Sequence, residues 1–76
     1  MNKSQAIRNI LTSQEFVDEM DAMKGELLDQ IMNSDDGQVD LREMAYIRIK
    51  TINEIMARLN SIANYDKIKD SALKIL

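Results

Sequence analysis

Hydrophobic residues recur three or four positions apart through most of the chain, and this helical period predicts helices and no strands. Capping and turn residues interrupt the pattern. They divide it into four predicted helices, at about 4–11, 14–33, 40–63 and 66–75. The two long middle helices can pair. We therefore expect an all-α fold in which a long antiparallel helical hairpin carries a short N-terminal and a short C-terminal helix, with residues 1–76 forming one domain.

The predicted helix at 14–33 has one hydrophobic side and one largely acidic side. Its apolar residues share a face: Phe16, Val17, Met20, Met23, Leu27, Leu28 and Ile31. Thr12, followed by Glu15 three positions later, predicts a capping box at its start. Gly25 lies inside the helix, where glycine costs about 1 kcal/mol relative to alanine. It either lets a partner backbone approach closely or marks a weak point.

The predicted helix at 40–63 carries a heptad seam. Its members follow one another at steps of four and three: Ala45, Ile49, Ile52, Met56, Leu59 and Ala63. A second line runs beside the seam at steps of seven: Leu41, Arg48, Ile55 and Ile62. The apolar face is therefore wider than a two-stranded coiled coil requires, and it predicts more than one neighbour for this helix. Asp40 with Glu43 predicts a helix cap at its start.

The segment between the two long helices has the residues of a turn, and we expect Gly37 to supply a positive φ there. The same segment partly matches a calcium-binding EF-hand loop over 32–43, with carboxylates at three ligand positions: Asp36, Asp40 and Glu43. Met32 stands at the first position, where an oxygen ligand is required. A turn followed by a cap explains these residues more simply, so we expect no metal ligand and keep a single EF-hand-like calcium binder as the third hypothesis.

The composition removes most catalytic chemistry. The chain has 76 residues and contains no Cys, His, Trp or Pro, which excludes disulfides, thiol nucleophiles and imidazole catalysis. We expect no catalytic residue, no cofactor and no enzyme activity. Its 45% hydrophobic residues exclude a disordered chain. A core of this size rarely supplies more than roughly 3–5 kcal/mol without covalent or metal staples, so we expect oligomerisation to complete the fold.

Charge is divided unevenly along the chain. Residues 1–40 carry nine acidic and three basic side chains, a net charge of −6. Residues 41–76 carry four acidic and seven basic side chains, a net charge of +3. Opposite signs favour antiparallel pairing of the two halves, within one chain or between chains. No apolar run approaches the length of a membrane span or a signal-peptide core, so we expect a cytoplasmic protein with no membrane partner.

A second candidate site lies on the exposed side of the helix at 40–63. Arg42, Tyr46 and Lys50 fall on one line, where two cations and an aromatic face could bind phosphates or a small anionic nucleotide. The simpler interpretation is that they form the solvated side of the helix. A recognition helix for DNA is short and polar, whereas this helix is long and apolar, so we do not expect a nucleic-acid partner.

In length, acidic composition and helix layout, with Leu41 to Ala63 (LREMAYIRIKTINEIMARLNSIA) as the second arm, the chain resembles the small helical-hairpin proteins of tailed bacteriophages. The resemblance implies a virion-associated or assembly protein that binds portal, capsid or copies of itself, in the host cytoplasm or incorporated in the virion. The rival role that it implies is a small inhibitor or sponge that captures a host protein or a signalling nucleotide.

The sequence thus predicts a non-enzymatic helical interaction protein whose partner is itself or a phage structural protein. The residues expected to form the interface are those of the two facing apolar stripes: Phe16, Met20, Met23, Leu27, Ile49, Ile52, Met56 and Leu59. Whether the two long helices close within one chain or between chains stays open at this point.

Overall fold

The computed structural model describes residues 2–65, and over that range it contains three helices and no strand. The helices are α1 (Lys3–Leu11), α2 (Gln14–Met32) and α3 (Val39–Ala63). The all-α prediction is therefore confirmed. The short C-terminal helix predicted at 66–75 lies outside the described residues.

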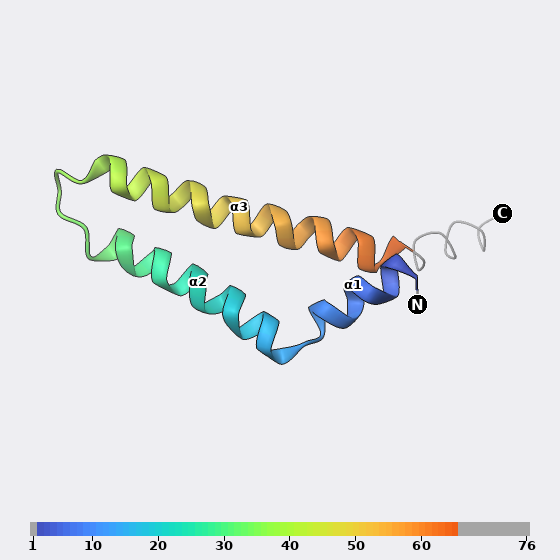
Figure 1. Cartoon of the computed structure of the whole chain (residues 1–76). Coiled ribbons are helices and arrows are strands. Elements are labelled where there is room, and N and C mark those ends of the chain that lie inside the picture. Colours follow the sequence, from blue (N-terminus) through green and yellow to red (C-terminus); the bar gives the residue numbers. More distant parts are fainter. Residues whose placement is uncertain (1, 66–76) are drawn as a thin grey trace.

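The long helix α3 is the element on which the other two pack. Figure 1 shows α2 running along the first part of α3 in the opposite direction and α1 lying against its last part. The bend between α1 and α2 is the point of the chain farthest from α3, and these two helices touch each other much less than either touches α3. The described helices thus form a single layer, with both broad sides uncovered by any other part of residues 2–65.

The bend between α1 and α2 is made by two hydroxyl residues with different roles. Ser13 has an extended backbone and accepts a hydrogen bond from Phe16 N at 3.5 Å, so it is the N-cap of α2. The Thr12 hydroxyl instead donates to the Arg8 carbonyl at 3.0 Å, in the last turn of α1. The predicted capping box of Thr12 and Glu15 is therefore wrong by one residue, because the Thr12 hydroxyl is used by the preceding helix.

The start of α3 also differs from the prediction. Its N-cap is Gln38, which makes no side-chain capping bond, and Asp40 lies in the first turn, where its charge favours the positive end of the helix dipole. The Gln38 Oε1 accepts from Asp35 N at 2.8 Å and so braces the loop. The predicted Asp40 cap is therefore not found. The predicted positive φ of Gly37 is not found either, because no residue of 2–65 has a positive φ.

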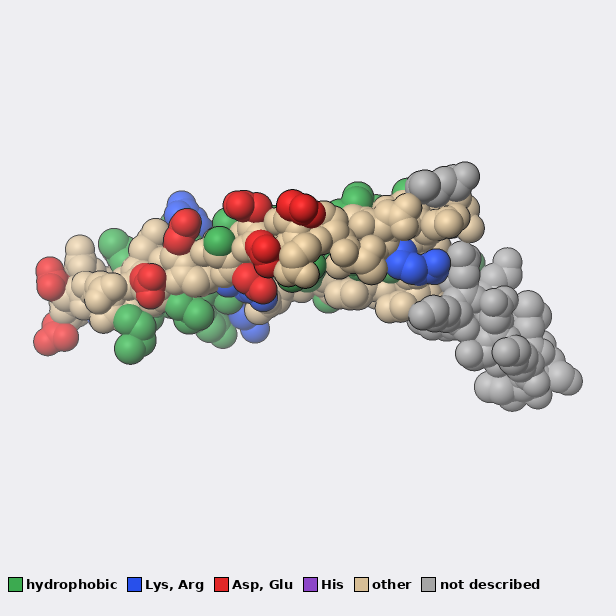
Figure 2. Space-filling view, turned by 90° about the horizontal axis from the view of Figure 1, so that it is seen from below, with side chains coloured by type: hydrophobic (Ala, Val, Ile, Leu, Met, Phe, Trp, Pro, Cys, Tyr) green, Lys and Arg blue, Asp and Glu red, His purple; other side chains and the backbone are tan. Residues whose placement is uncertain are grey.

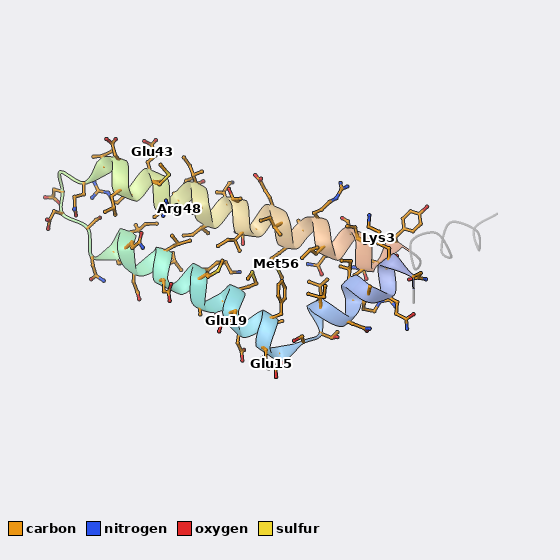
Figure 3. The ribbon with its side chains drawn as sticks, viewed as in Figure 1. Lys3, Glu15, Glu19, Glu43, Arg48 and Met56 are labelled. Carbon is orange, nitrogen blue, oxygen red and sulfur yellow. The ribbon has the colours of Figure 1, made fainter. Side chains whose placement is uncertain are left out.

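The core lies between α2 and α3. Leu27, Ala45 and Ile52 are buried there, and four half-buried hydrophobic residues pack around them: Met20, Ile31, Ile49 and Met56. Every residue of the predicted α3 seam is buried or half-buried. Figure 3 shows Met56 on the side of α3 that faces α2. The core is nevertheless small, because the buried hydrophobic residues of 2–65 are only Leu27, Ala45, Ile52 and Ala63.

Candidate interaction surfaces

The residues predicted to form a self-association interface lie mostly inside the contact between α2 and α3 of one chain. Leu27 and Ile52 are buried, and five more are half-buried: Phe16, Met20, Ile49, Met56 and Leu59. Met23 is the exception, with 40% of its surface exposed. The structure therefore brings the predicted residues together, and the chain itself covers most of them.

The hydrophobic surface that remains uncovered comes largely from other residues. Eleven large hydrophobic residues are exposed in the described part of the chain: Ile10, Met23, Leu28, Met32, Val39, Leu41, Met44, Tyr46, Ile47, Ile55 and Tyr65. Most of them lie between the second half of α2 and the middle of α3. Figure 2 shows hydrophobic side chains gathered toward the end of the molecule where the loop between α2 and α3 lies. Both sides of the layer contribute, and they differ in chemistry.

The first side is defined by a second stripe on α3, which we call the Arg48 face. Its members on α3 alternate at steps of three and four: Leu41, Met44, Arg48, Thr51, Ile55, Arg58 and Ile62. On α2 the face continues with Met23, Glu26 and Gln30, because these residues line one open groove of about 450 Å³ together with Arg48 and Thr51. The face is thus apolar and basic along α3 and more acidic along α2.

The opposite side contains the predicted anion-binding residues, and we call it the Tyr46 face. The Arg42 guanidinium is directed toward the loop between α2 and α3. Its Nη1 donates to Ser34 Oγ at 3.0 Å and to the Asp35 carbonyl at 2.6 Å, and its Nη2 donates to the Asp36 carbonyl at 3.1 Å. The structure therefore uses Arg42 to hold the loop between α2 and α3.

The other two residues of that predicted site stay exposed. The Lys50 Nζ lies 5.8 Å from the centroid of the Tyr46 ring, a cation–π arrangement on the helix surface. Arg42 is only half-buried, but its donors face the loop. Of the three predicted residues, Lys50 and the Tyr46 ring are therefore the two that an anionic ligand on this face would meet.

The same Arg42 contacts bear on the EF-hand-like window. Ser34, at the third ligand position of that window, already accepts a hydrogen bond from the Arg42 guanidinium through its Oγ. The same guanidinium donates to the carbonyls of Asp35 and Asp36, so it places a positive charge against this loop. Glu43 points outward from α3, away from α2 (Figure 3). Residues 2–65 contain no group of three or more acidic side chains that could hold a metal ion. The cation that contacts this loop is the guanidinium of Arg42, from the start of α3.

A second arginine fixes the other end of α3. Arg8 on α1 donates from Nη2 to the Ala63 carbonyl at 2.8 Å, across 55 positions of sequence, and its Nε is buried without a hydrogen-bond partner. Carbonyls in the last turn of a helix have no partner within the helix, so a cationic donor there also favours the helix dipole. Sequence reasoning missed both arginine contacts, because neither contact has a local motif.

The opposite charges of α2 and α3 are not joined by ion pairs within the described part of the chain. Over residues 2–65 the structure contains one ion pair, between Lys24 and Asp21 of α2 at 3.9 Å. Arg48 and Arg58 take part in none over that range, although acidic residues are numerous along α2. Figure 3 shows Arg48 on α3 and the glutamates of the first half of α2 at separate places along the layer. The charge complementarity predicted from the sequence therefore does not take the form of ion pairs between α2 and α3 within residues 2–65.

Comparison with known proteins gives no further guide, since no family model matches the chain and neither a curated protein nor a solved structure is significantly similar to it. None of the helices in the described part of the chain is long and apolar enough to cross a membrane.

Proposed function

We propose that this chain is a non-enzymatic helical interaction protein, which self-associates or packs on a larger structural protein, and that this association completes its helical hairpin. The supporting observation is that only four hydrophobic residues of the described part are buried, whereas eleven large hydrophobic residues are exposed. Two of the four buried residues are alanines, which remove little apolar surface from water. In the described part, more large hydrophobic residues are therefore exposed than fully buried.

The energetic argument starts from that small core. Full burial of a large aliphatic side chain stabilises a fold by about 1.5–3 kcal/mol, whereas ordering each backbone residue costs roughly 1–2 kcal/mol. Leu27 and Ile52 are the only large hydrophobic side chains between residues 2 and 65 that are buried. Domains are normally built from two packed layers, and one layer leaves both of its sides wet. A second layer supplied by another chain would stabilise this one.

The biological setting that we propose follows the resemblance in length, composition and helix layout. It is the assembly of a tailed bacteriophage particle, in which the partner is another copy, portal or capsid. The rival role as a nucleotide sponge has less support, because Arg42, its central cation, is bound to the carbonyls of the α2–α3 loop. The calcium-binding hypothesis has less support because Met32 stands at the first ligand position and the Arg42 guanidinium contacts Ser34, at the third.

The test of this proposal is the absolute mass of the purified full chain, measured by light scattering over a wide range of concentrations. Self-association predicts a defined multiple of the 8.7 kDa chain mass. A monomer that is only partly helical would point to the larger structural partner instead. A fully helical, cooperatively folded monomer at every concentration would contradict the proposal, because such a chain would need no partner. Addition of calcium should leave the mass unchanged.

A further inference from the structure

We propose that the Arg48 face is covered by the same face of a second copy, so that α3 of each copy lies on α2 of the other. This inference rests on the proposed self-association and names its geometry. The result would be a two-layer arrangement of four long helices, in which each layer is one chain.

The first argument is the position of the second stripe on α3. Each of its residues from Met44 onward immediately precedes a residue of the seam, so the stripe is rotated from the seam by about 100°, slightly more than a quarter turn. A helix in a four-helix arrangement contacts two adjacent neighbours on sides that lie about a quarter turn apart. The seam already faces α2 within the chain. The second stripe leaves Met44 and Ile55 each 52% exposed, as expected where the second neighbour is missing.

The second argument is the charge on the two halves of the face. The α3 half carries Arg48 and Arg58. The α2 half carries Glu26, with Glu19 seven residues and Glu15 eleven residues before it on the same side of the helix. Neither arginine is in an ion pair with any residue of 2–65. The face is therefore complementary to itself when its two halves are exchanged, which is what an interface between identical chains requires.

Charge also selects between the two ways in which identical layers can meet. A two-fold axis that runs across the helices would stack α2 on α2, and it would place acidic residues against acidic residues. A two-fold axis parallel to the helices stacks α3 on the partner's α2 and keeps each residue at its own height along the layer. Arg48 and Glu26 line one groove and so share a height, which places Arg48 opposite the partner's Glu26. Arg58 then lies toward the end of the partner's α2 that carries Glu15 and Glu19.

The third argument is area. The 25 residues of α3 span about 37 Å at 1.5 Å per residue, and two packed helices are about 20 Å wide, so one side of the layer covers roughly 700 Å². A stable interface of standard size buries about 800 Å² on each partner. One face of this layer is therefore of the size that a stable dimer needs.

The decisive experiment mixes two full-length variants, Arg48→Glu and Glu26→Arg, and follows mass by light scattering and sedimentation. Alone, each variant places like charges opposite each other at two symmetric positions, and we expect its dimer dissociation constant to rise at least about tenfold over wild type. In a one-to-one mixture, the new carboxylate of the Arg48→Glu chain faces the new guanidinium of the Glu26→Arg chain. The other symmetric contact keeps its two native side chains, so both contacts are attractive. We expect the mixture to recover a mixed dimer, a result that no contact within one chain can produce.

The matched control is Lys50→Glu, which makes the same charge change on α3 but on the Tyr46 face, and it should dimerise like wild type. Failure of the mixture to recover, or equal weakening by Lys50→Glu, would overturn the Arg48 face as the interface. If wild type were already a folded monomer at all concentrations, self-association itself would fail. A wild-type oligomer that the Arg48→Glu and Glu26→Arg changes leave intact would contradict only the geometry proposed here.

Discussion

The two ends of α3 are both held by an arginine that donates to backbone carbonyls, but the two contacts differ in reach. Arg42 lies in the first turns of α3 and binds loop carbonyls six and seven residues before it. Arg8 lies on α1 and binds the last residue of α3 across 55 positions. Arg42 therefore shapes a local turn, whereas Arg8 determines where a separate helix lies. Loss of the long-range contact should cost more, because the Arg8 bond is partly buried, whereas the Arg42 bonds to the two loop carbonyls are exposed.

The largest loss of stability is expected at Ile52, in the centre of the core between α2 and α3. Ile52→Asp would bury an unpaired carboxylate among Leu27 and Ala45, and we expect a loss of about 3–5 kcal/mol, enough to unfold the chain. Circular dichroism and urea titration would measure it. Asn53→Asp, at the exposed next position, is the control. A folded Ile52→Asp protein of normal helicity would contradict the placement of the α3 seam in the core.

Next in size is the α1 end. Arg8→Met keeps much of the side-chain length but removes the donor to the Ala63 carbonyl, and we expect about 1.5–3 kcal/mol of destabilisation, the range for a hydrogen bond to a charged group. Hydrogen exchange should show lost protection in α1 while α2 keeps its own. Lys3→Met, an exposed cation on the same helix, should change little. Equal loss of protection in α1 and α2 would mean that Arg8 does not position α1 specifically.

The loop end should respond less. Arg42→Ala removes three hydrogen bonds from groups that are mostly exposed, and we expect about 1 kcal/mol of destabilisation, with changes in amide exchange confined to residues 33–38. Lys50→Ala is the matched control on the same side of α3. If Arg42→Ala cost as much as Arg8→Met, the distinction between a local and a long-range contact would be wrong.

The smallest expected effect is a gain in stability. Gly25 lies in the middle of α2, and a Cβ added there would meet nothing within 4 Å. Gly25→Ala should stabilise the protein by about 0.5–1 kcal/mol by improving helix propensity, as thermal unfolding would show, without changing the oligomeric mass. Destabilisation or a lower mass would instead indicate that another backbone approaches α2 closely at this position.

These comparisons show how far the sequence could predict the molecule. The all-helical class follows from the hydrophobic period, and the heptad from Ala45 to Ala63 identifies the side of α3 that is covered. The caps could not be assigned to the right residue, because Thr12 and Ser13 are both able to cap and only the structure shows that Thr12 bonds back to α1. The arginine contacts depend on side-chain reach in three dimensions, which residue spacing does not encode.

The sequence likewise does not distinguish core residues from interface residues. A hydrophobic period shows that a side chain is covered, but it does not show which chain covers it. Seven of the eight residues predicted as an interface are buried or half-buried by their own chain, whereas Ile55 of the second line stays exposed. The prediction of another neighbour for α3 rests on that second line, at steps of seven beside the seam.

The central claim, that a second chain completes this fold, is tested most directly by the concentration dependence of thermal unfolding. If folding and association are coupled, the unfolding midpoint Tm should rise by roughly 5–10 °C over a hundredfold increase in protein concentration. A single Tm that does not change over that range, together with a monomeric mass below it, would contradict the claim and show that one layer of helices is stable alone.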